Sequence, residues 1–76
     1  MLSLDQEQAH LAKAELDIAD GQSRITAQEL RIQEMRLKGR DTLRAEELLV
    51  TLQATLVQWR AHREEILRTI RRLEAS

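Results

Sequence analysis

One short segment, residues 38–42 with the sequence Lys-Gly-Arg-Asp-Thr, interrupts a 76-residue chain that contains no proline. The residues on both sides are mostly strong helix formers, so the sequence predicts helices over about residues 3–38 and 42–75, joined by a turn at 39–41. We therefore expect residues 1–76 to form a single all-α domain, an antiparallel two-helix hairpin that resembles a coiled coil.

The predicted helix ends and the charges agree with this topology. Gly39 can take the left-handed conformation that ends a helix, and Asp41 or Thr42 can cap the helix that follows. Residues 1–20 carry one lysine and five acidic residues, a net charge of −4, whereas residues 56–76 carry five arginines and three glutamates, a net charge of +2. An antiparallel hairpin lays the acidic start beside the basic end, and the helix dipole favours the same distribution.

Apolar residues recur along both halves at heptad-like spacings of three and four, which indicate a helix seam and exclude a strand. Glu7, Gln28 and Arg63 are the polar residues that interrupt this seam. We expect the stem of Arg63 to be packed and its charged head to lie in water. The residues that the pattern places in the hairpin core are Leu11, Ile18, Gly21, Ile25, Ile32, Leu49, Leu52, Leu56, Trp59, Ile66 and Ile70.

A second apolar stripe lies about 150° from the main seam on each helix, at ~100° per residue. Two helices can cover only one stripe each, so the chain is expected to self-associate into a homodimer or a larger helical bundle, or to bind another protein. The pattern leaves open which stripe faces into the hairpin. The candidate oligomer face consists of Ala12, Leu16, Ala19, Leu30, Val50, Ala54, Val57 and Ala61.

Gly21 is the one glycine within a predicted helix. With the turn near residue 40, facing residues should have numbers that sum to about 80. This register predicts that Gly21 faces Trp59, the one aromatic residue of the chain. A missing side chain opposite an indole is explained by core packing, which we favour over a hinge or a binding notch.

Two short patterns, Glu7-x-x-His10 and His62-x-x-Glu65, resemble parts of a di-iron carboxylate site. The predicted register separates the two histidines by ~12 Å along the axis, and both lie off the main seam. Two solvated histidines explain the pattern better. The chain also has no cysteine, no nucleophile paired with a base and no convergent carboxylates, so we expect neither an enzyme nor a cofactor or metal site.

Arg36, Lys38, Arg40 and Arg44 gather at the hairpin tip and form a candidate anion-binding site. They could bind phosphate, an acidic partner or RNA. The chain offers no aromatic residue near them for base stacking, and its net charge is −1. Basic residues at a helix C-terminus also have a structural role. Nucleic-acid binding is therefore only the alternative interpretation.

No apolar run approaches the ~20 residues that span a bilayer, and no apolar segment follows a basic start as in a secretory signal. The basic, amphipathic stretch from Arg60 to Leu73 indicates membrane-surface binding only weakly, because the seam already uses its apolar residues. We expect a cytoplasmic protein with no membrane partner.

The stretch from Ala19-Asp20-Gly21 through residues 38–42 to Glu47-Leu48-Leu49, followed by His62-Arg63, covers most of the chain. It resembles a group of short helical-hairpin proteins of unknown function that are frequent in alphaproteobacteria such as rhizobia. The resemblance implies a bacterial origin and a hairpin, and it brings no activity or site residue.

These features together predict a non-enzymatic, homo-oligomeric hairpin that acts as a protein–protein interaction or scaffold module. The alternatives are a small nucleic-acid-associated regulator that uses the basic tip, and a subunit of a hetero-oligomer such as a chaperone or an antitoxin.

Overall fold

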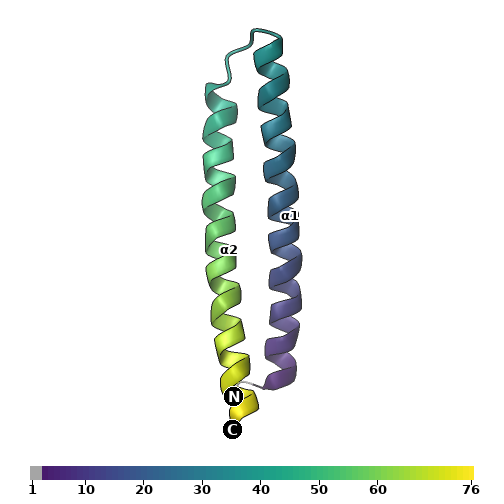
Figure 1. Ribbon diagram of the computed structural model, residues 1–76, viewed down its shortest axis with the longest axis vertical. Helices are drawn as coiled ribbons and strands as arrows, with labels where there is room; N and C mark the ends of the chain where they lie inside the picture. The colour runs from purple at the N-terminus through teal and green to yellow at the C-terminus, as the bar shows by residue number, and fades with distance from the viewer. Residues whose placement is uncertain (1–2) are drawn as a thin grey trace.

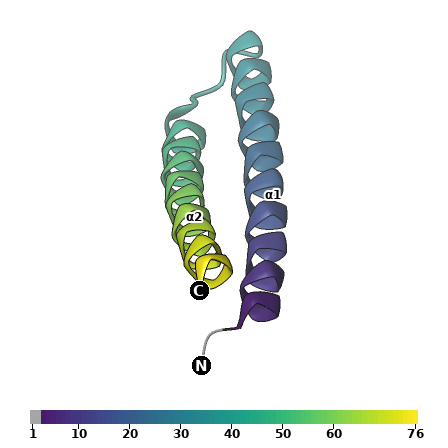
Figure 2. The ribbon, with the colours of Figure 1, turned by 60° about the horizontal axis from the view of Figure 1, so that its bottom comes forward.

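The computed structural model describes residues 3–76 and contains two helices, α1 (Leu4–Leu37) and α2 (Leu43–Ala75). The helices run antiparallel and side by side, so the start of α1 lies beside the end of α2, as Figure 1 and Figure 2 show. The molecule is 59 Å long and 16 Å by 14 Å across. The all-α helical hairpin is confirmed. The connection, residues 38–42, is one residue longer at each end than expected.

Gly39 ends α1 as the sequence indicates. Its φ of +69° lies in the left-handed region, where a Cβ would be strained. The Gly39 N–H donates to the carbonyl of Arg36 over 3.0 Å, and the Arg40 N–H donates to the carbonyl of Met35 over 2.9 Å. This pair of bonds is a Schellman motif, which satisfies carbonyl groups that the last turn of a helix leaves free.

Side chains cap the N-termini of both helices. Ser3 accepts a hydrogen bond from the Gln6 N–H over 3.2 Å at the start of α1. At the start of α2, Asp41 Oδ1 accepts from the Leu43 N–H over 3.0 Å, whereas the side chain of Thr42 makes no capping bond. Of the two candidates, Asp41 is therefore the capping side chain.

The main seam, and not the second stripe, faces into the hairpin. The eleven residues placed in the core by the sequence are all buried or half-buried: Leu11, Ile18, Gly21, Ile25, Ile32, Leu49, Leu52, Leu56, Trp59, Ile66 and Ile70. A packed cluster of Ala14, Ile66 and Ile70, with Leu4 and Leu11 against it, lies toward the end where the chain starts and finishes.

Two of the polar seam residues find partners. Gln28 Nε2 donates across the hairpin to the carbonyl of Ala45 over 2.9 Å. Glu7 is only 6% exposed, and its Oε2 lies 2.7 Å from His10 Nδ1. Because buried polar groups are costly without a hydrogen bond, these contacts explain how the seam tolerates both residues.

The side chain of Arg63, the third polar seam residue, is partly buried in the seam and partly exposed to water. Its side chain is 40% exposed, yet its Nε is buried and has no hydrogen-bond partner. The Oε1 of Glu15 lies 4.0 Å from that Nε, which is too far for a hydrogen bond. Arg63 therefore packs its stem in the seam while part of the side chain reaches solvent.

The residue that faces Gly21 differs from the predicted one. A Cβ built on Gly21 would lie 3.4 Å from Leu56 Cδ1 and would meet no other residue across the hairpin within 4 Å. The facing residue numbers sum to 77 at this position, whereas Ala14 clusters with Ile66, a sum of 80. The predicted pairing of Gly21 with Trp59 is wrong. The residue facing Gly21 lies about one turn earlier in α2.

Candidate interaction surfaces

The second apolar stripe of each helix faces solvent. Leu16 on α1 is 71% exposed, and Val50 and Val57 on α2 are 64% and 66% exposed. The remaining residues predicted for an oligomer face are exposed as well: Ala12, Ala19, Leu30, Ala54 and Ala61. Monomeric proteins rarely leave large contiguous apolar patches uncovered, so these stripes are candidate contact surfaces.

The two outer stripes point to nearly opposite sides of the hairpin. Each lies about 150° around its helix from the seam, and the two seams face each other. A closed four-helix bundle would require each helix to present two apolar faces about 90° apart. One partner molecule can therefore cover the outer stripe of α1 or that of α2, but not both.

A groove follows one edge of the hairpin near its tip. Its larger part has a volume of about 660 Å³ and combines apolar residues with arginines, among them Arg24, Ala27, Gln28, Arg31, Leu48 and Leu52. A continuation of about 330 Å³ shares Gln28, Arg31 and Leu48 and extends to Met35, Arg44 and Ala45. We call both parts together the tip groove. Leu48, which the two parts share, is 48% exposed.

The basic residues near the tip differ in their partners. Arg36 forms an ion pair with Glu46 that links α1 to α2, so this member of the predicted anion site closes the hairpin instead. Arg24 pairs with Asp20 one turn away.

Within residues 3–76, the other three members of the predicted anion site, Lys38, Arg40 and Arg44, form no ion pair. Arg31 forms none either. Of these four residues, Arg31 and Arg44 line the tip groove, so positive charge remains available there.

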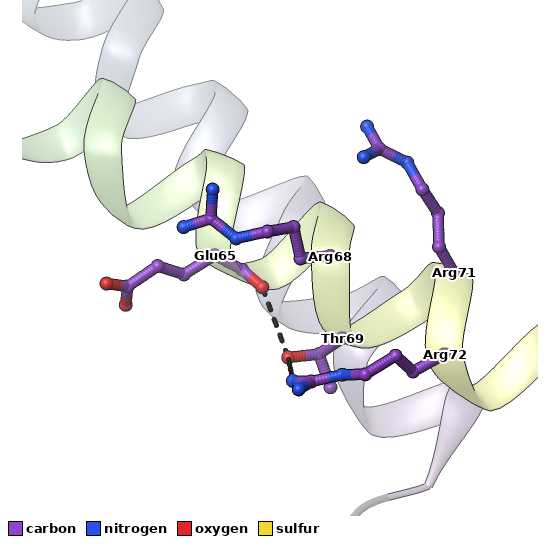
Figure 3. A pocket seen from close by; sticks show the side chains of 5 residues that line it. All are labelled: Glu65, Arg68, Thr69, Arg71 and Arg72. Atoms are coloured by element: carbon purple, nitrogen blue, oxygen red, sulfur yellow. Dashed lines mark hydrogen bonds between the residues drawn. The ribbon is translucent and has the colours of Figure 1, made fainter.

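A second cluster of arginines lies at the end of α2, where Arg68, Arg71 and Arg72 surround Glu65 and Thr69 in a shallow hollow. Arg72 donates to Thr69 Oγ1, and Thr69 donates to the Glu65 carbonyl. Figure 3 shows that Arg68 and Arg72 extend to the same side of α2, whereas Arg71 points away from them. The negative end of the helix dipole also disfavours an anion here. This cluster is a solvated helix end rather than a binding site.

The histidines are held by local contacts. His10 bonds to Glu7, its neighbour one turn away, and His62 packs edge-on against Trp59 with ring centroids 6.2 Å apart. Among residues 3–76, no three histidine, aspartate or glutamate side chains converge as metal ligands would.

Comparisons with protein-family models, with curated proteins and with solved structures find no match. The resemblance to the alphaproteobacterial hairpins therefore stays a prediction. Neither α1 nor α2 has a stretch long and apolar enough to cross a membrane.

Sequence reasoning did not single out Leu48 or Arg31 as surface residues. Leu48 immediately precedes the seam residue Leu49, and Arg31 immediately precedes Ile32. In an antiparallel pair, the positions just before the seam residues of the two helices face each other along one edge. That rule and the predicted sum of about 80 could have placed Leu48 beside Arg31, because their numbers sum to 79.

Proposed function

We propose that this chain is a non-enzymatic interaction module that works as a homo-oligomer. The observation that carries the proposal is the exposure of large apolar side chains on both outer stripes, represented by Leu16, Val50 and Val57. The hairpin uses its main seam internally, so a second interface has to come from another molecule.

Light scattering over a micromolar concentration series tests self-association. We expect a mass above that of the 8.8 kDa monomer, rising with concentration. A monomer at every concentration that is also thermally stable would contradict the proposal.

Two single substitutions test the two outer stripes separately. Leu16→Asp places a charge on the stripe of α1, and Val57→Asp places one on the stripe of α2. At least one should reduce the mass, because a buried unpaired carboxylate is costly. Gln58→Asp adds the same charge at an exposed position of α2 and serves as the control. If both stripe variants associate like the wild type, the outer stripes are not the interface.

A second candidate function is supported by the basic residues at the tip, such as Arg40, that form no ion pair within residues 3–76. They could contact the phosphates of a nucleic acid. A mobility-shift titration at two salt concentrations tests this, since such binding should weaken with salt and with Arg40→Glu.

A further inference from the structure

We infer that the tip groove of one copy receives the first half of α1 from another copy. The docking element is an acidic stripe, defined here as Ala12, Leu16 and Ala19 with the flanking Glu15 and Asp20. This inference rests on the proposed self-association and names the two surfaces that meet in it.

The apolar parts of the two surfaces are complementary in shape. Leu16 is 71% exposed and lies between Ala12 and Ala19. Because these neighbours have small side chains, the side chain of Leu16 protrudes beyond them. The larger part of the tip groove is a wide, shallow depression of about 660 Å³ that Leu48 and Leu52 line. A projecting leucine on a smooth helix fits such a depression, as ridges fit grooves between helices.

The charges are complementary as well. Glu15 and Asp20 lie within about one turn of Leu16 on either side of it. Both side chains are mostly exposed, although Asp20 pairs with Arg24 and Glu15 lies 4.0 Å from Arg63 of the same chain. Arg31 and Arg44 line the groove and form no ion pair within residues 3–76. Docking would place carboxylates beside guanidinium groups, which form short, charge-assisted hydrogen bonds.

The same charges disfavour contact between like surfaces. Groove against groove would bring Arg31 near Arg31 of the other copy, and stripe against stripe would bring Glu15 and Asp20 near like charges. Like charges across an interface are costly. Stripe therefore meets groove, either reciprocally in a closed two-fold dimer or head to tail, in which case a pair keeps one free stripe and one free groove and the assembly extends as a ring or a filament.

The groove fits a protein helix better than a nucleic acid. It contains Leu48 and Leu52, and Glu34 lies among its basic residues. The single aromatic residue, Trp59, lies on the seam and not in the groove, so no ring is available there for base stacking.

Reciprocal charge reversal tests the contact. The groove-reversed variant carries Arg31→Glu and Arg44→Glu, and the stripe-reversed variant carries Glu15→Lys and Asp20→Lys. Each variant should lose self-association, because its stripe and its groove now have the same sign. An equimolar mixture should regain the wild-type mass, because each stripe again meets a groove of opposite charge.

The control is Arg71→Glu with Arg72→Glu, which changes the charge of the chain equally at the end of α2. It should keep the wild-type mass. Circular dichroism of every variant shows whether the hairpin still forms. Because a mixture can associate only if both variants fold, recovery of mass also excludes misfolding as the cause of the loss.

The outcomes separate this inference from the proposed function. A wild-type protein that stays monomeric would overturn both. A wild-type oligomer that persists in either reversed variant, or a mixture that stays monomeric, would overturn only the docking of stripe into groove. Titration with a labelled single-stranded oligonucleotide is the last measurement. Binding that the groove-reversed variant loses, with no change in its mass, would assign the groove to nucleic acid instead.

Discussion

The end of the hairpin where the chain starts and finishes buries Ala14, Ile66 and Ile70 in one cluster, whereas between residues 22 and 55 only Ile32 is buried to a similar degree. The tip half instead contains the tip groove, which Arg31 and Arg44 line without forming an ion pair within residues 3–76. Most of the tight packing thus lies toward the end where the chain starts and finishes, which we call the open end. We therefore expect the open end to contribute more to stability than the tip half.

The first prediction concerns stability at the two ends. Ile66→Ala should lower the free energy of unfolding by about 2–5 kcal/mol, because it removes a buried side chain from the cluster. Leu48→Ala, in the half-exposed groove, should cost only about 0.5–1 kcal/mol. Urea unfolding of both variants at one fixed protein concentration measures the difference. Equal losses would show that the ends do not differ in packing.

The second prediction concerns the polar contact that holds the tip half together. Gln28→Ala removes the hydrogen bond to the Ala45 carbonyl and the packed stem of Gln28, so it should cost about 1–2 kcal/mol. Gln28→Leu should cost less, because leucine restores the packing and the carbonyl still accepts its own helix N–H. If Gln28→Leu is the more damaging change, the hydrogen bond matters more than the apolar contact.

The third prediction concerns Gly21, between the two ends. Gly21→Ala should stabilise the hairpin by up to about 1 kcal/mol, since alanine is the better helix former. The new Cβ would lie 3.4 Å from Leu56 Cδ1, an ordinary contact with the end of a flexible side chain. Urea unfolding of Gly21→Ala, of Trp59→Leu and of the pair should give additive effects. A net loss, or coupling to Trp59, would mean that Trp59 leaves no room for a methyl group at Gly21, as the predicted pairing of these two residues implied.

Gly21 shows which features of the fold could be predicted from the sequence and which could not. Heptad spacing was enough to identify the hairpin and its seam, because an apolar stripe has to be buried somewhere. The residue facing Gly21 was missed by about one turn, because one sum does not describe every contact between the helices. The tip groove was missed for another reason: Leu48 and Arg31, whose numbers sum to 79, face each other in the predicted register as well, but they lie off the seam and were not considered.

The hydrogen bond from Gln28 shows a further limit of the sequence. A glutamine in an apolar seam is expected to destabilise the packing. Its position in the sequence does not indicate that a backbone carbonyl of α2 lies within hydrogen-bonding distance. Glu7 is similar, because its burial beside His10 follows from the position of the facing helix. Contacts of this kind depend on distances of a few tenths of an ångström, which a pattern of residue types does not specify.

The smallest predicted effect concerns the ion pair between Arg36 and Glu46 at the tip. Both side chains are substantially exposed, and exposed pairs typically contribute about 0.2–1 kcal/mol. We expect the double-mutant cycle of Arg36→Ala and Glu46→Ala to give a coupling energy in this range, which should decrease further at high salt. Because the pair joins the two helices next to the turn, its loss should also accelerate hydrogen exchange in the first turn of α2 while leaving the cluster around Ile66 protected. A coupling energy of several kcal/mol would mean that this ion pair stabilises the tip as strongly as the buried cluster stabilises the open end. The two ends would then not differ in stability.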